Sequence, residues 1–170
     1  WCASRMLTLD RTYAKEILNS IGASQSVTDR ERAQIALSYH CLSLLDVFWV
    51  KEENEKIRFE DINLFAHSLS NALVDIALRG HQMTVTNAHL LANDLSTGGL
   101  YPKAWVRKED GFYLYKDGGR DAVEREVLAS KICRCFDCHQ VLYEQGMFEN
   151  EPVSISKIMT SQRYSLVTYA

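Results

Sequence analysis

The sequence predicts an α+β protein in which a mostly helical N-terminal region, residues 1–93, precedes an antiparallel sheet with one packed helix, residues 94–170. Two observations predict this division. Apolar residues recur at helical spacing in the first region, whereas the second contains short runs of aromatic and β-branched residues between turn signals. The contents of 46% hydrophobic and 24% charged residues are ordinary for a globular chain of 170 residues.

Charge and hydropathy argue against several functional classes. The formal net charge of −3 gives no electrostatic reason to expect direct contact with nucleic acid. No apolar stretch approaches the roughly 20 residues that span a bilayer, and the N-terminus lacks a signal-peptide pattern. We therefore expect a cytoplasmic protein without a membrane partner. Because the chain begins with Trp1, we also expect a fragment of a longer protein.

Three helices are expected in the N-terminal region. The first covers residues 11–19 after the capping residue Asp10, and a third covers residues 69–79. Thr28 and Glu31 match the capping-box pattern at the start of the second helix. That helix carries one apolar stripe at helical spacing, formed by Ile35, Tyr39, Leu42 and Leu45. The segment that follows could be a short buried strand or the end of a helix.

A β-hairpin opens the second region. Asp110 and Gly111 are a two-residue turn signal, and with this pair at the turn centre Trp105 is expected opposite Lys116. Residues 112, 114 and 116 then share one face of the sheet. Strands over residues 141–144 and 153–158 are expected later, joined through Gly146 and Pro152.

A helix over residues 121–136 is predicted between the hairpin and the later strands. Its apolar stripe consists of Leu128, Ala129, Ile132, Cys133 and Phe136. Cys135, Cys138 and His139 raise the question of zinc, but a structural zinc site needs four ligands, usually supplied as two pairs. Since no second pair occurs in the sequence, we expect no metal and small buried thiols at the helix end. The odd number of cysteines, five, favours reduced thiols.

A possible site for nucleotide phosphates spans the glycine-containing loop and the hairpin. Gly98 and Gly99 let backbone N–H groups approach phosphate oxygens closely, and Lys103 adds a cation beside them. Lys116, on a strand and flanked by apolar residues, can bridge phosphates if a carboxylate orients it. Protein kinases combine a glycine-rich loop over the nucleotide phosphates, a strand lysine that contacts them and a helix glutamate that pairs with the lysine.

The orienting carboxylate is expected on the following helix. Glu124 and Glu126 lie about 200° apart on a helical wheel, at opposite borders of the apolar stripe, so only one can serve Lys116. The wheel alone does not choose between them. Each feature also has a simpler explanation, because glycine pairs are common in loops and strand lysines often protect sheet edges.

The order and spacing of these motifs resemble the N-lobe of HipA-like serine/threonine kinases. The similar segments are residues 97–104, 113–116 and 126–132, and the resemblance covers roughly residues 94–158. It implies that Lys116 holds the phosphates of ATP and that Glu126, rather than Glu124, orients it. The loop that contains Gly98, Gly99 and Lys103 would cover the nucleotide.

The resemblance also has implications for catalysis and regulation. Ser96 and Thr97 lie where family members can autophosphorylate, although Gly98 stands where some members carry a second serine. The family's catalytic aspartate and its magnesium ligands have no counterpart in this sequence. We therefore expect no catalytic residue in this chain, with Mg²⁺ bound by a C-lobe outside it.

Three functions follow as hypotheses. In the first, the full protein transfers the ATP γ-phosphate to a serine or threonine of a protein substrate, in a toxin–antitoxin setting. In the second, the chain is a stand-alone, non-catalytic interaction module, an antitoxin-like partner of a HipA-like kinase. The third is a DNA-associated regulator built on residues 10–45. It is disfavoured because the link over residues 21–26 is long for a helix-turn-helix and the second helix lacks a basic cluster.

Overall fold

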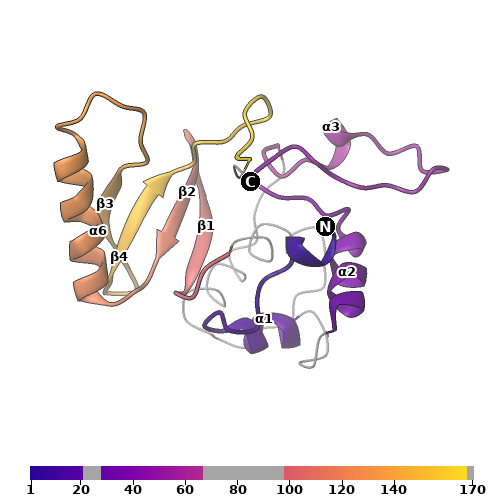
Figure 1. Cartoon of the computed structure of the whole chain (residues 1–170), viewed down its shortest axis with the longest axis horizontal. Coiled ribbons are helices and arrows are strands. Elements are labelled where there is room, and N and C mark those ends of the chain that lie inside the picture. Colours follow the sequence, from indigo (N-terminus) through magenta and orange to yellow (C-terminus); the bar gives the residue numbers. More distant parts are fainter. Residues whose placement is uncertain (21–27, 67–97, 168–170) are drawn as a thin grey trace.

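The computed structural model describes residues 1–20, 28–66 and 98–167, and within these ranges the chain is an α+β protein, as predicted (Figure 1). The N-terminal part contains a 3-10 turn and three helices in its described residues: η1 (Ala3–Arg5), α1 (Ala14–Ser20), α2 (Asp29–Ser38) and α3 (Phe59–Ile62). The C-terminal part contains β1 (Lys103–Lys108), β2 (Gly111–Lys116), α6 (Arg120–Cys133), β3 (Tyr143–Phe148) and β4 (Glu151–Lys157). The helix predicted over residues 69–79 lies outside the described residues, as does the link over 21–26.

The predicted capping box begins α2. The Thr28 hydroxyl accepts a hydrogen bond from the Glu31 N–H at 3.3 Å, and the Glu31 carboxylate accepts one from the Thr28 N–H at 2.7 Å. The helix is shorter than its apolar stripe predicted, because His40 and Cys41 have φ angles of 57° and 55°. This left-handed backbone ends the helix. Leu42 is nevertheless buried, although it lies beyond the helix.

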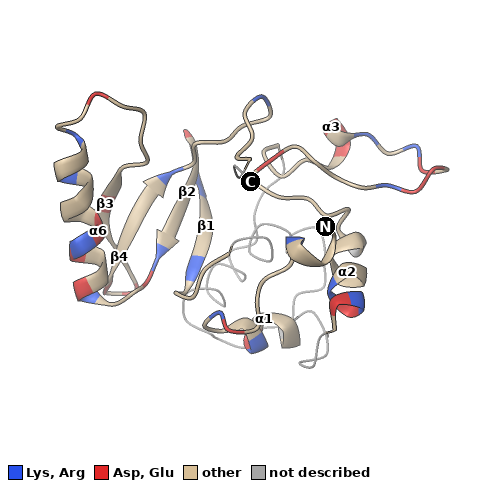
Figure 2. Ribbon diagram, viewed as in Figure 1, with Lys and Arg blue, Asp and Glu red and all other residues tan. Residues whose placement is uncertain are grey.

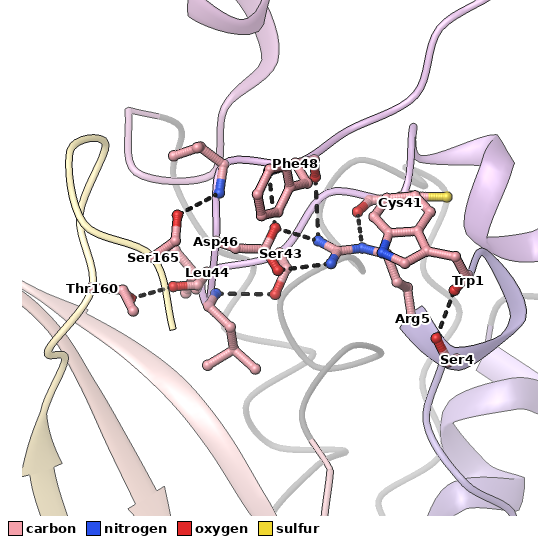
Figure 3. A network of polar contacts seen from close by, with 12 residues as sticks. Trp1, Ser4, Arg5, Cys41, Ser43, Leu44, Asp46, Phe48, Thr160 and Ser165 are labelled. Atoms are coloured by element: carbon pink, nitrogen blue, oxygen red, sulfur yellow. Dashed lines mark hydrogen bonds and ion pairs between the residues drawn. The ribbon is translucent and has the colours of Figure 1, made fainter. Parts of the chain in front are cut away.

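Residues 46–51, expected as a strand or a helix end, form neither. An arginine holds this segment instead. The Arg5 guanidinium donates to both carboxylate oxygens of Asp46, at 2.7 and 2.9 Å, and to the carbonyl oxygen of Cys41 at 2.6 Å (Figure 3). The two charged side chains are only 10% and 11% exposed. A buried charge pair of this kind fixes a segment that has no ladder of backbone hydrogen bonds.

The segment after β4 returns to the N-terminal part. The Thr160 hydroxyl donates to the carbonyl oxygen of Leu44, and the Ser165 hydroxyl oxygen accepts from the Val47 N–H at 3.3 Å (Figure 3). The apolar core is likewise shared between the two regions. Its buried members include Leu7, Ile17, Tyr39, Leu42 and Leu64 from the first region and Ala104, Trp105 and Phe112 from the sheet.

The sheet is antiparallel, with strand order β1-β2-β4-β3. In the first hairpin Trp105 lies opposite Leu114, and Lys103 lies opposite Lys116. The predicted register was therefore wrong by two residues, because the turn is centred one residue earlier than expected. Asp110 is held in that turn, where its carboxylate accepts from the Tyr113 hydroxyl at 2.7 Å. A two-residue slip preserves the alternation of side chains, so the predicted faces are correct.

The second hairpin also differs from the prediction. Gly146 and Pro152 lie within β3 and β4, and the turn consists of Glu149 and Asn150. These two residues have φ angles of 49° and 69°, as a two-residue turn of type I′ requires. A Cβ at Gly146 would collide with the end of the Ile155 side chain, which would have to shift.

Helix α6 packs against β3 and β4, at the edge of the sheet remote from β1 (Figure 1). Its buried residues are Val123 and Ser130. The prediction that the apolar stripe packs against the rest of the protein was wrong. Leu128, Ile132 and Phe136 are 58%, 54% and 62% exposed. Polar contacts to the sheet set the rotation of the helix. No helix in the described ranges is long and apolar enough to cross a membrane.

Replacing Asp46 with asparagine tests the role of the buried charge pair. The change keeps the side-chain shape but leaves the Arg5 guanidinium without its carboxylate. We expect the free energy of unfolding, measured by urea denaturation, to fall by about 3 kcal/mol. The control is Asp29→Asn, since Asp29 pairs with Arg32 on the surface and its side chain is 88% exposed. That change should cost less than about 1 kcal/mol. Equal losses in the two variants would contradict this role.

Candidate functional site

Lys116 lies at the end of β2, where side chains from four elements meet. Its ammonium group donates to Glu126 Oε1 of α6 at 2.9 Å and to the Tyr143 hydroxyl of β3 at 2.8 Å. The second carboxylate oxygen of Glu126 accepts a hydrogen bond from the Ser154 hydroxyl of β4. The structure thus pairs Lys116 with Glu126, whereas Glu124 is exposed. Figure 2 shows the charged residues of α6 beside the sheet.

A short connection places α6 beside this end of the sheet. Gly119 precedes the helix with a φ angle of 78°, and its N–H donates to the Asp117 carboxylate at 3.2 Å. Farther along the helix, the Ser130 hydroxyl accepts from the N–H of Tyr143 at 2.7 Å, which holds the start of β3 against α6. The Tyr143 ring therefore lies under the Lys116 ammonium group, 4.4 Å from it.

Lys116 is held in its charged form. Burial lowers the pKa of Lys116, but the hydrogen bonds to Tyr143 and Glu126 outweigh that effect and raise the pKa above its ordinary value. The group is therefore a fixed cation at neutral pH. An ammonium that is both charged and immobilised loses little further freedom when it binds an anion.

Lys103 provides a second cation, directly across the hairpin from Lys116. The side chain is buried, with the residue 6% exposed, and its ammonium group donates to the carbonyl oxygen of Gly98 at 2.5 Å. Gly99 has a φ angle of 102°, and a Cβ at this position would collide with the Lys103 ammonium. Glycine at position 99 therefore lets the loop fold closely over the lysine.

The cations in this part of the structure repel one another. The pKa of Lys103 is lowered to about 8, chiefly by burial and also by the positive charges of Arg11 and Lys116, against the opposing effect of Glu126. Arg11 is fixed here because its guanidinium donates to the carbonyl oxygen of Lys103 at 2.7 Å. Among the described residues, Lys103 and Lys116 thus lie close to Glu126, and Arg11 lies beside Lys103. A negatively charged ligand placed among them would relieve the repulsion, so the arrangement is suited to anion binding.

Sequence reasoning found part of this site. Gly98, Gly99, Lys103, Lys116 and Glu126 all lie in the described residues, and the structure brings the last three close to one another. Three contributors were missed: Arg11, Tyr143 and Ser154. Ser154 faces Lys116 only because β4 pairs with β2 across an intervening helix and strand, a pairing that no local signal indicates. Ser96 and Thr97 lie outside the described residues.

The cysteines near the end of α6 were expected to be small buried thiols. That expectation was wrong for Cys135 and Cys138, which are both exposed, while Cys133 is partly buried. Helix α6 ends at Cys133, so Cys135 and Cys138 lie in the segment that leads to β3. In the described ranges no group of three or more His, Cys, Asp or Glu side chains could hold a metal ion.

Comparisons with known proteins identify no relative of this chain. No protein-family model, no curated protein and no solved structure matches it. The geometry around Lys116 and Lys103 is therefore the main indication of function.

The lowered pKa of Lys103 predicts a contribution to folding stability that depends on pH and that the variant Lys103→Met lacks. Between about pH 8 and pH 10.4 the folded protein has released the Lys103 proton while the unfolded chain retains it, so folding stability rises with pH. Below pH 8 both states carry the proton and this contribution is constant. We expect the free energy of unfolding of the wild type, minus that of Lys103→Met, to increase across this window.

Parallel urea titrations of the two proteins at several pH values would measure this difference. The Cys41 thiol also contributes in this range, because burial raises its pKa to about 12 in the folded protein, whereas the thiol of the unfolded chain titrates at about pH 8.5. Its contribution is present in both proteins and cancels in the subtraction. A difference that stays flat, or falls, between pH 8 and pH 10 would contradict the assignment.

Proposed function

We propose that residues 94–170 form the nucleotide-binding N-terminal part of a HipA-like serine/threonine kinase. The observation that carries the proposal is the ion pair between Lys116 and Glu126 at 2.9 Å. Protein kinases use a strand lysine for the nucleotide phosphates and a helix glutamate that pairs with it. Here the lysine ends β2 and the glutamate lies on the helix that follows directly.

The residues around this pair suit the phosphates of ATP. Lys116 and Lys103 lie opposite each other at one end of the hairpin, and Arg11 adds a third positive charge. The loop at Gly98 and Gly99 adjoins Lys103 and lacks side chains that would block a phosphate. In the proposal the phosphates replace the Gly98 carbonyl as the partner of the Lys103 ammonium group.

In this proposal the residues of the site position the nucleotide and do not carry out the chemical step. Lys116 orients the phosphates, Glu126 holds Lys116, and Tyr143 and Ser154 hold the pair in turn. The Mg²⁺ that accompanies ATP would neutralise charge that develops on the phosphoryl oxygens. Its ligands and the catalytic base would come from a segment outside this chain. Transfer to a serine or threonine hydroxyl of a cytoplasmic protein substrate, and autophosphorylation at Ser96 or Thr97, belong to the full protein.

A second candidate function is a non-catalytic interaction module, such as an antitoxin-like partner of a kinase. The observation that favours it is the row of exposed apolar side chains along α6 and just beyond its end, formed by Leu128, Ile132 and Phe136. Such a row is costly to leave in water and is typical of contact surfaces. Nucleotide binding separates the two candidates, since the module does not require it.

Substitution of Lys116 tests the first candidate. The full-length protein that contains this chain would be titrated with a non-hydrolysable ATP analogue and Mg²⁺ by isothermal calorimetry. We expect Lys116→Met to weaken the affinity by tenfold to a hundredfold, because a charge-assisted contact to phosphate contributes about 1.5–3 kcal/mol. The matched control is Lys131→Met, which removes the same charge from an exposed position on α6.

The control variant should bind the analogue within twofold of the wild type. If the wild type binds the analogue and Lys116→Met binds it equally well, the assignment of Lys116 to the phosphates is wrong. If the wild type does not bind the analogue at all, the interaction module becomes the better description.

A further inference from the structure

A cavity of about 620 Å³ lies near the opposite end of the sheet from the Lys116–Glu126 pair. Lys108, at the far end of β1, and Tyr113 and Lys157, which face each other across β2 and β4, contribute to its lining. The segment between α6 and β3 completes it with residues that include Arg134 and Leu142. The cavity shares no residue with the proposed phosphate site.

The lining contains three cations and one carboxylate, and with Asp110, which lies outside the lining and pairs with Lys157, the excess is one positive charge. Lys157 is neutralised by Asp110 at 2.7 Å, and Arg134 has a loose contact of 3.7 Å with Glu144. Lys108 contacts the face of the Tyr113 ring, with its ammonium group 4.5 Å from the ring centroid. Within residues 1–20, 28–66 and 98–167, Lys108 has no carboxylate partner. Three cations against two carboxylates leave one positive charge, in a chain whose net charge is −3.

The remainder of the lining is largely apolar. The residues of this kind are Val141, Leu142, Ile155, Ile158 and Met159. Met159 is 60% exposed, so an apolar group that entered the cavity would remove its side chain from water. An apolar wall beside a single unbalanced positive charge defines an amphipathic site. A cavity with a few placed polar groups and this volume is of the size that binds small molecules.

We propose that this cavity binds a small organic monoanion with an apolar body, of the class of alkyl carboxylates. The carboxylate of the ligand contacts Lys108 and Arg134. The Arg134 guanidinium can bind this carboxylate through two N–H groups when the ligand displaces the exposed Glu144. The chain packs against the apolar wall beside Leu142 and Ile155. A single carboxylate matches the single unbalanced charge, whereas a phosphate dianion would leave an excess of negative charge.

Octanoate, 1-octanol and acetate separate the two contributions to binding. Isothermal calorimetry on the full chain should show saturable binding of octanoate with a Kd below about 1 mM. The alcohol has the same chain without the charge, and acetate has the charge without the chain. Each should bind at least tenfold more weakly than octanoate, because the site requires both parts.

The variants are chosen at exposed positions so that the fold is retained. In the double variant Lys108→Met with Arg134→Met, the affinity for octanoate should fall at least tenfold. The control is the single variant Lys131→Met, which removes a positive charge from the same helix but lies outside the cavity. It should bind octanoate like the wild type. Thermal melting of all three proteins should show no loss of folded protein at the temperature of the titration.

Three results would overturn the proposal. The first is the absence of saturable octanoate binding to the wild type. The second is equal affinity of octanoate for the wild type and the double variant, which would place the ligand elsewhere. The third is equally tight binding of 1-octanol, which would reduce the site to a non-specific apolar surface.

Discussion

The ion pair between Lys116 and Glu126 organises the sheet half of the molecule. Through Tyr143 and Ser154 it connects β2, α6, β3 and β4 at one point. A partly buried ion pair repays its desolvation only when further hydrogen bonds satisfy both partners. This condition holds for both partners, because Lys116 has a second acceptor in Tyr143 and Glu126 has a second donor in Ser154. The pair therefore fixes the position of the helix against the strands, as well as the charge of Lys116.

This constraint has two consequences elsewhere in the structure. With Glu126 and Ser130 turned to the sheet, the opposite side of α6 carries its apolar row into solvent, which leaves Leu128 and Ile132 more than half exposed. The fixed charge of Lys116 also contributes to the lowered pKa of Lys103, which lies opposite it on β1. One arrangement thus accounts for an unpartnered helix face and for a cluster of cations that is suited to an anion.

The sequence predicted those features of the fold that depend on short-range patterns. Thr28 and Glu31 indicated the start of α2, and the alternation along β2 placed Lys116 on the correct face. The hairpin register was missed, because Asp110 is also held by a long-range contact to Lys157 of β4. The exposed stripe of α6 was missed for a similar reason. Periodicity assigns apolar residues to the core, whereas here the polar contacts of the helix determine which side faces the sheet.

A double-mutant cycle on nucleotide affinity tests most directly whether Glu126 acts through Lys116. The affinity for an ATP analogue would be measured in the wild type, in Lys116→Met, in Glu126→Gln and in the double variant. The account predicts that Glu126→Gln weakens binding severalfold in the wild type but changes it less than twofold in the Lys116→Met background. Equal losses in the two backgrounds would show that the residues act independently, and would contradict the proposed clamp.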